Sequence, residues 1–242
     1  RHVIRNALLV FLVGFSHGYT LLFMEAISLF FLLTPRGFFT RLAYLFKVYA
    51  LGGMLLAFWL LPLLIFGKYT SPYHLAWVIY SYKEILPDIL LPVAIAAIVG
   101  TIGLLAWHWR TKRRGGDLAC APSAVGLLWF GALIAAFMFI AAPKLGVVDI
   151  RYVPCAQLMA CLLAAMGLGW LGAKLRRGAA AVPMLIAVTG LTLFWTAQHV
   201  GFASDWTRWN YSGFEAKPAY PIFAQMNRAL RGTFQDPRVV FE

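Results

Sequence analysis

The sequence predicts an all-α, polytopic membrane protein with about six or seven membrane segments, followed by the start of a C-terminal extracytoplasmic domain. The chain has 242 residues, of which 62% are hydrophobic and only 12% are charged. A soluble domain is about half apolar and about a quarter charged, so this chain carries more apolar surface than a water-soluble core buries. Several apolar runs reach the roughly 20 residues that a membrane-spanning helix needs. Basic residues form short clusters between these runs, which is typical of a cytoplasmic membrane face.

The first apolar run, Ala7–Leu33, allows two interpretations. At ~1.5 Å per residue it is long enough to be one tilted span. Its middle, "SHGYT" (Ser16–Thr20), is polar and contains a glycine, and basic residues stand at both ends of the run. This pattern favours two short helices that enter the membrane and turn at His17 and Gly18. Non-helical backbone at that depth is stable only against protein or a water-filled cavity.

Five later runs are predicted to span the membrane. They are Val48–Phe66, Ile89–Trp109, Ala124–Ala142, Pro154–Gly172 and Ala180–His199. The strongest basic clusters, Arg110–Asp117 and Lys174–Gly178, lie between them and are expected in the cytoplasm. The alternate loops Gly67–Asp88 and Pro143–Tyr152, and everything after Gly201, then face outward.

The charge count supports this orientation. The inside loops contain ten basic residues and one acid, whereas the outside loops contain four basic residues and three acids. The net charge of +12 therefore reflects membrane topology, and it predicts no binding to nucleic acid. We expect a multi-pass protein of the inner (plasma) membrane.

Residues 1–200 are predicted to form the transmembrane region and residues 201–242 the start of an extracytoplasmic soluble domain. Tyr220–Arg231 has apolar residues at helical spacing, and Arg238–Phe241 has the pattern of a β-strand that is cut short. The chain begins with Arg1, so we expect it to be an internal piece of a longer polypeptide, whose remainder is a partner of this region.

The loop "GVVDIRYVP" places charged residues between two apolar runs. An Arg beside a membrane surface is often only a solvated or snorkelling side chain. The alternative is that Arg151 binds a phosphate at the outer face, because its planar guanidinium matches phosphate oxygens. Asp149 is close enough to orient Arg151 or to act as a separate acid, and Lys144 adds positive charge.

His17 is a further candidate binding residue. A single His in an apolar run is commonly a packed side chain with one hydrogen bond, but an ionisable group at membrane depth is also a functional candidate. Glu25 is the only acid within a predicted span. The three cysteines, Cys120, Cys155 and Cys161, have no metal-binding spacing, so neither a disulfide nor a zinc site is expected. No metal-ligand set is visible, although a divalent metal cofactor remains an open alternative.

Four stretches carry a resemblance to a known family. "FSHGYTLLF", "LLAFWLLPLL", "DIRYVPCAQL" and "WNYSGFEAKPAYPIF" occur in this order. Together they resemble the bacterial membrane-protein family called 6-pyruvoyl-tetrahydropterin-synthase-related, a label that implies no pterin chemistry. That family is similar to GT-C glycosyltransferases, which use sugars linked to polyprenyl phosphate.

The resemblance implies an active site on the outer membrane face. His17 resembles the polar or basic residue in the turn of a GT-C short helix pair, and Arg151 resembles a basic residue of a later outer loop that faces the lipid carrier. GT-C enzymes place their catalytic acid in the first outer loop, so that acid is expected upstream of this chain and no catalytic residue is assigned here. The alternative is a non-catalytic membrane scaffold or a transporter of lipid-linked glycans.

Overall fold

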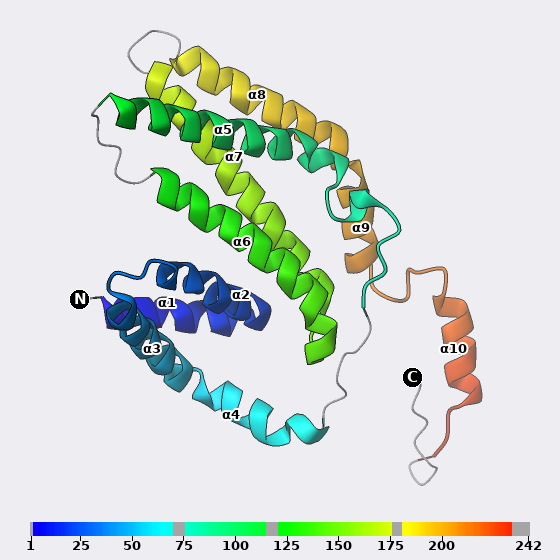
Figure 1. The fold of residues 1–242 in the computed structure, drawn as a ribbon. Coiled ribbons are helices and arrows are strands. Elements are labelled where there is room, and N and C mark those ends of the chain that lie inside the picture. Colours follow the sequence, from blue (N-terminus) through cyan, green and yellow to red (C-terminus); the bar gives the residue numbers. More distant parts are fainter. Residues whose placement is uncertain (1, 70–75, 115–120, 176–180, 234–242) are drawn as a thin grey trace. The chain divides into compact units, whose positions relative to one another are not determined.

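A computed structural model describes residues 2–69, 76–114, 121–175 and 181–233 of the chain. Within these ranges the structure contains ten α-helices and no strand (Figure 1). The helices are α1 (Val3–Ser16), α2 (Gly18–Ser28), α3 (Phe38–Leu55), α4 (Ala57–Phe66), α5 (Leu91–Arg113), α6 (Ala121–Ala141), α7 (Val153–Leu175), α8 (Ala181–His199), α9 (Gly201–Tyr211) and α10 (Tyr220–Ala229). The all-α prediction is confirmed.

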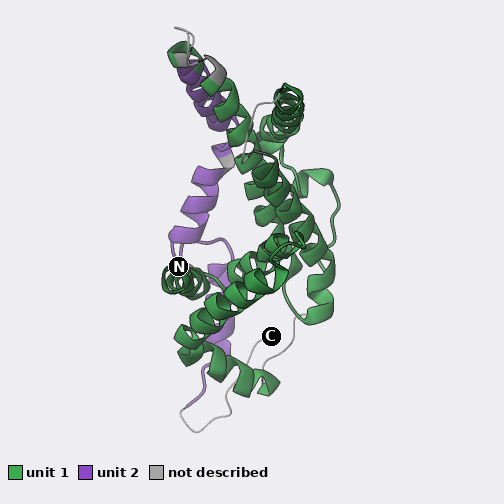
Figure 2. Cartoon of the chain, turned by 60° about the vertical axis from the view of Figure 1, so that its left-hand side comes forward, with its two compact units in different colours: residues 1–184 green, residues 185–242 purple. Residues whose placement is uncertain are grey.

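The chain divides into two compact units, Arg1–Met184 and Leu185–Glu242, which Figure 2 colours separately. This boundary falls within α8. The predicted division at residues 200 and 201 separates membrane from aqueous parts and stays a prediction, because a division by internal contacts does not test it.

Helices α5 and α7 are in close contact through two glycines. A Cβ atom added to Gly167 would lie 2.6 Å from the Cα of Gly100. Small residues allow membrane helices to approach closely, and the resulting van der Waals contact holds them together. Gly103 contacts Trp170 further along the same pair. Since the residue numbers of both helices rise together along the contact, α5 and α7 run parallel.

Helix α6 completes a three-helix bundle and runs antiparallel to α5 and α7. Met159 of α7 lies against Gly131 of α6, whereas Leu163, one turn later in α7, shares a buried cluster with Val125. As a result, residues 110–114 and 174–175 lie at one end of the bundle, called here the basic end. Residues 142–152 lie at the opposite end, called the loop end. The predicted shared side of the two basic clusters is thus confirmed for their described residues. Which end faces the cytoplasm remains a prediction from the distribution of charge.

The first apolar run is a broken helix pair, as favoured from the sequence. His17 separates α1 from α2 and has an extended backbone with φ −163° and ψ 110°. Helix α2 packs antiparallel to α6, since Ile27 lies against Gly131 whereas Phe23 shares a buried cluster with Ala142, the residue after α6. The turn at His17 therefore lies at the loop end.

The predicted span Val48–Phe66 is not one straight helix, and the structure allows either a broken span or a re-entrant loop here. The chain bends by 81° between α3 and α4, and Leu56 at the break has φ −86° and ψ −2°. Gly52 and Gly53 precede the break, and glycine pairs are common at helix kinks. Gly52 packs against Val10 of α1, so α3 remains attached to α1 up to the bend while α4 leaves in a new direction.

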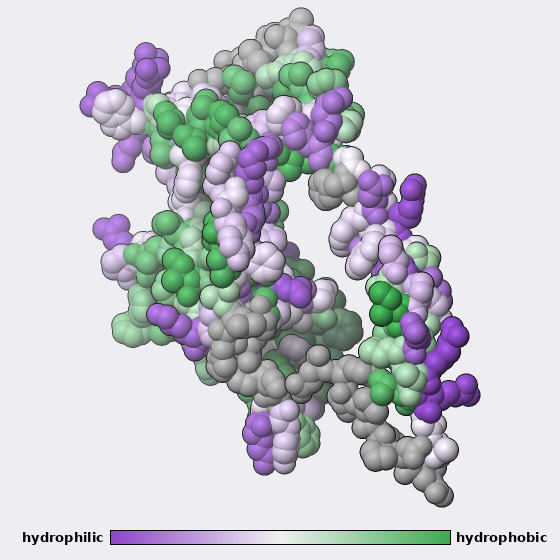
Figure 3. All heavy atoms as spheres, turned by 90° about the vertical axis from the view of Figure 1, so that its right-hand side faces the viewer, coloured by the Kyte–Doolittle hydropathy of each residue, from purple (hydrophilic) through white to green (hydrophobic). Residues whose placement is uncertain are grey.

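The number of candidate membrane spans is lower than predicted when helices are counted by their length and composition alone. Among the described residues, three helices are long and apolar enough to cross a membrane, or up to five if each bent pair is one span. The predicted six or seven also counted the short helices α1 and α2. Many large apolar side chains are exposed, including Phe39 at 82% and Leu64 at 75%. Figure 3 shows green apolar patches on the face that it draws. Such a surface suits contact with lipid.

Helix α8 lies within the predicted span Ala180–His199, of which Ala180 is outside the described residues. Helix α9 follows α8 in the second unit at a bend of 56°. Helix α10 confirms the predicted helix over Tyr220–Arg231. Phe214 packs edge-on against Phe223, with ring centres 4.9 Å apart, and this contact holds the start of α10. The predicted strand Arg238–Phe241 lies outside the described residues.

Candidate functional site

A pocket of about 350 Å³ lies at the loop end of the first unit. It is formed by the α1–α2 turn, the start of α4 and the loop before α7. Its lining residues are Gly14, Phe15, Ser16, His17, Gly18, Tyr19, Leu56, Phe58, Trp59 and Arg151. Among these residues only Arg151 carries a full charge, and none is acidic. The pocket therefore combines aromatic walls with one fixed positive charge.

His17 has a defined role in the local structure because its side chain caps α2. Its Nδ1 accepts a hydrogen bond from the backbone N–H of Thr20 at 3.3 Å. This bond satisfies one of the free N–H groups at the start of the helix. Since Nδ1 accepts this bond, the ring proton is on Nε2, whose N–H is a donor. The side chain is exposed to the pocket.

Arg151 is positioned by two tyrosines. Its Cζ lies 5.6 Å from the centre of the Tyr19 ring, which is within the range of a cation–π contact. The Tyr19 ring in turn contacts the edge of Tyr152, with ring centres 6.2 Å apart. Tyr152 is only 2% exposed. The Arg151 side chain therefore contacts Tyr19, and Tyr19 in turn contacts the buried core at Tyr152.

Asp149 does not contact Arg151 in this structure. Its carboxylate is buried, with 2% of the residue exposed. It accepts hydrogen bonds from the backbone N–H of Trp77 at 2.7 Å and of Ile150 at 2.6 Å. These bonds attach the loop before α5 to the loop before α7. The positive charge of Arg151 thus has no partner carboxylate within the described part of the chain, where the ion pair found is Lys83–Asp88.

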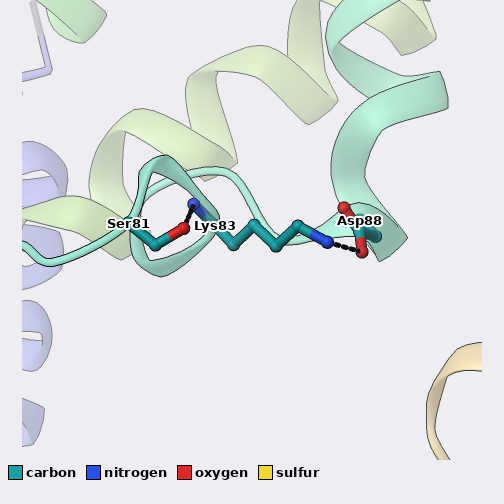
Figure 4. Close-up of polar contacts among 3 residues, drawn as sticks. All are labelled: Ser81, Lys83 and Asp88. Atoms are coloured by element: carbon teal, nitrogen blue, oxygen red, sulfur yellow. Dashed lines mark hydrogen bonds and ion pairs between the residues drawn. The ribbon is translucent and has the colours of Figure 1, made fainter.

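The loop before α5 is itself ordered by one carboxylate. Glu84 accepts hydrogen bonds from the indole N–H of Trp77 and the backbone N–H groups of Tyr80 and Ser81. The bond from the Trp77 indole, followed by that from the Tyr80 N–H, lowers the pKa of Glu84. Ser81 Oγ accepts from the backbone N–H of Lys83, which completes a capping box (Figure 4).

The same loop has two further contacts, one within the loop and one with α7. Lys83 Nζ donates to Asp88 at 2.7 Å, and this hydrogen bond raises the pKa of Lys83 (Figure 4). Gln157 of α7 donates from Nε2 to the backbone oxygen of Ile85, also at 2.7 Å. The described acids of this loop are thus occupied by internal contacts and do not enter the lining of the pocket.

Of the four candidate residues, the structure brings His17 and Arg151 into one pocket. Lys144 lies in a 3-10 turn after α6, with an exposed side chain, and is not part of the lining. Asp149 is buried and does not line the pocket, and its carboxylate accepts hydrogen bonds from backbone N–H groups. Their assignment as substrate-binding residues remains a prediction.

Two residues of the site were missed from the sequence. Tyr19 was considered only as a neighbour of His17, and Trp59 was assigned to the interior of a span. A Cβ atom at Gly18 would lie 3.3 Å from the Trp59 ring, so the indole covers the α1–α2 turn. The Gly52–Gly53 pair was the available indication that the chain bends before Trp59.

A metal centre is not evident in the described part of the chain. No group of three His, Cys, Asp or Glu side chains there is arranged to hold an ion. Cys155 and Cys161 have free thiols, and Cys120 lies outside the described residues.

The fold and the pocket define a helical, multi-pass membrane protein with a cationic pocket at one end of its bundle. Residues 1–198 match the family described as 6-pyruvoyl-tetrahydropterin synthase related domain, a membrane protein family. The chain belongs to this family, as the resemblance indicated. No curated protein and no solved structure matches the chain.

Proposed function

We propose that the pocket at the loop end binds the phosphate of a polyprenyl-phosphate-linked sugar at the extracytoplasmic face. In this account residues 1–200 form the C-terminal half of the membrane domain of a GT-C-like glycosyltransferase, and residues 201–242 begin its extracytoplasmic domain. One observation supports the proposal most strongly. Arg151 and His17, which are 134 positions apart in the sequence (151 − 17), line the same pocket, and no carboxylate lines it.

The chemistry of the pocket suits a phosphate attached to an apolar chain. A guanidinium donates two parallel hydrogen bonds to phosphate oxygens, and the bonds are strengthened by charge. Tyr19 restricts the guanidinium to the rim, so less conformational entropy is lost when the phosphate binds. Phe15, Phe58 and Trp59 supply the apolar surface that a lipid carrier needs.

His17 adds a hydrogen-bond donor from the α1–α2 turn to the same lining. Its tautomer is determined by the bond from the Thr20 N–H to Nδ1, which leaves Nε2–H available. A hydrogen-bond donor beside the Arg151 guanidinium gives the bound phosphate a second contact. We therefore assign Arg151 the charge and His17 a positioning hydrogen bond.

In the proposed reaction an acceptor hydroxyl attacks the anomeric carbon of the sugar, and the bond from that carbon to the phosphate oxygen breaks. The proton of the hydroxyl passes to a general base, which the GT-C resemblance puts in the preceding part of the polypeptide. The electron pair stays on the carrier phosphate. Arg151 stabilises the charge that grows on this leaving group, and a divalent metal is compatible with the same role.

The test uses the full-length protein with a polyprenyl-phosphate-linked sugar, and transfer to an acceptor is measured. We expect Arg151→Ala to lower transfer about tenfold or more, because a charge-assisted bond to phosphate contributes roughly 1.5–3 kcal/mol. Lys68→Ala is the matched control, since Lys68 is an exposed cation of the outer loop that lies over Tyr69 and outside the pocket.

The second candidate function is a non-catalytic scaffold or transporter of lipid-linked glycans. It is favoured if the full-length protein binds the lipid in an Arg151-dependent manner but transfers no sugar to any acceptor. If Arg151→Ala leaves both binding and transfer unchanged in a folded protein, the pocket is not a phosphate site and both functions lose their support.

A further inference from the structure

A second and larger pocket lies at the other end of the first unit. It has a volume of about 720 Å³ and is formed by α1, α2 and α3, with Leu127 of α6. Pockets for small ligands commonly measure ~300–1,000 Å³. Because α1 and α3 begin and α2 ends at the basic end, these lining residues place the pocket near that end of the bundle. It shares no lining residue with the pocket of His17 and Arg151.

Most of the wall is hydrocarbon. Leu9, Val10, Ile27, Leu45 and Val48 are among the lining residues. A buried water needs two to four polar partners, so water is a poor occupant of such a space. An apolar pocket at membrane depth is instead filled by hydrocarbon.

The polar groups in the wall are largely used within the protein. Asn6 Nδ2 donates to the Tyr44 hydroxyl at 2.8 Å. The hydroxyl of Tyr49 donates to the backbone oxygen of Met24, and that of Ser28 donates to the oxygen of Glu25. A polar metabolite would therefore find few groups in the wall to orient it, whereas an acyl chain needs none.

Arg41 is the charged residue of the lining, and no acid lines the pocket. It donates from Nη1 to the backbone oxygens of Phe31 at 3.0 Å and Thr34 at 3.4 Å. A guanidinium has five N–H donors, and both of these bonds use the same nitrogen. Donors on the other nitrogens are thus available for an anion beside the apolar space.

We propose that this pocket binds one acyl chain of an anionic phospholipid from the leaflet at the basic end, with Arg41 contacting the lipid phosphate. Arg36 lies in the turn before α3 and has an exposed side chain, which adds attraction for anionic headgroups. The inference does not depend on the proposed function, since it concerns a different pocket at the opposite end.

The test uses the full-length protein in nanodiscs of phosphatidylcholine and phosphatidylglycerol. The probe is phosphatidylglycerol with a photoactivatable group at the end of one acyl chain, and crosslinked peptides are mapped by mass spectrometry. We expect crosslinks to the pocket residues of α1 and α3, and their loss in Leu45→Trp, which fills the pocket. Phe46→Trp is the matched control, because Phe46 is the next residue, is 72% exposed and does not line the pocket.

The headgroup contact is tested with Arg41→Gln against Lys47→Gln. We expect Arg41→Gln to lower the preference for phosphatidylglycerol over phosphatidylcholine about fivefold. This is the change in affinity that one basic residue near an anionic membrane surface contributes. We expect Lys47→Gln to change it much less. Since Arg41 also bonds two backbone oxygens, Leu45→Trp keeps the test valid if Arg41→Gln does not fold.

Three results would overturn the proposal. The first is equal crosslinking in wild type and Leu45→Trp. The second is equal crosslinking by phosphatidylcholine, which removes the anionic headgroup from the account. The third is a crosslink from a photoreactive residue at position 45 to another segment of the same polypeptide, which would show that protein fills the space.

Discussion

The guanidinium of Arg151 lies over the ring of Tyr19, with 5.6 Å between Cζ and the ring centre. The two residues come from different parts of the chain, and their contact joins the α1–α2 turn to the loop before α7. The charge of Arg151 is thereby held at the rim of the pocket that His17 also lines.

Replacing Tyr19 tests this positioning. We expect Tyr19→Leu to weaken binding of a polyprenyl phosphate about two- to fivefold, because a cation–π contact contributes ~0.5–1 kcal/mol at an exposed site. Tyr19→Phe keeps the aromatic face and should retain most of the affinity. Affinity of the purified full-length variants for the lipid phosphate is the measurement. Equal loss in both variants would show that the hydroxyl matters and that the ring contact does not.

The contact of Gly100 with Gly167 predicts a stability effect. Gly167→Ala puts a methyl group against the Gly100 backbone and should destabilise the protein by ~1–3 kcal/mol, as overpacking does. Gly169→Ala, in the same helix, has open space at its Cβ position and should be neutral or slightly stabilising, since Ala favours helix. Thermal unfolding in detergent compares the two. Similar midpoints would contradict the close approach of α5 and α7.

Asp149 is predicted to hold the loop before α5. Asp149→Ala removes the acceptor for the N–H groups of Trp77 and Ile150, at a cost of ~1–3 kcal/mol for unpaired buried donors. Hydrogen exchange of residues 76–88 should become faster. Asp88→Asn breaks an exposed ion pair, which contributes only ~0–1 kcal/mol, and should change exchange little. An unaltered exchange rate in Asp149→Ala would contradict the structural role of Asp149 and leave substrate binding as its alternative role.

Glu84 makes the order of the same loop dependent on pH. Its pKa in the folded protein lies below the ordinary value of 4.5, because the Trp77 indole, then the Tyr80 N–H, hydrogen-bonds its carboxylate. The stabilisation is present above pH 4.5 and is lost as the pH falls through the lower folded pKa. Exchange of residues 76–88, corrected for the intrinsic rate, should rise over that acid range in wild type.

The matched variant for this pH effect is Glu84→Gln, which cannot titrate. Its loop should exchange faster than wild type at neutral pH and show no acid transition. Lys83→Gln breaks the pair with Asp88 and should keep the wild-type transition. An acid transition that persists in Glu84→Gln would assign the pH effect to another group.

The sequence pattern was sufficient for the helices whose apolar runs match membrane thickness. The described structure has α5, α6 and α7 close to the runs 89–109, 124–142 and 154–172. Composition alone determines such helices, because a long apolar run has few other stable conformations in lipid. The turn at His17 was also predictable, since a polar pentapeptide interrupts the first run.

The bend at Leu56 was not predicted. The residues from Val48 to Phe66 are continuously apolar, and hydropathy does not report a change in the direction of the helix axis. For the same reason, the sequence did not indicate that Trp59 lines the pocket. The bonds of Asp149 were equally out of reach, because they depend on a backbone N–H of Trp77, 72 positions away. Proximity in sequence suggested Arg151 as its partner, whereas packing of the two loops provided backbone donors.

The central claim is that the pocket recognises a lipid phosphate through Arg151. The most direct test is the affinity of the full-length protein for polyprenyl phosphate compared with the neutral polyprenol, in wild type, Arg151→Ala, Arg151→Lys and Lys68→Ala. We predict a phosphate preference in wild type that falls about tenfold or more in Arg151→Ala. It should recover only in part in Arg151→Lys, which lacks the fork geometry, and stay intact in Lys68→Ala. An unchanged preference in a folded Arg151→Ala variant would contradict the account.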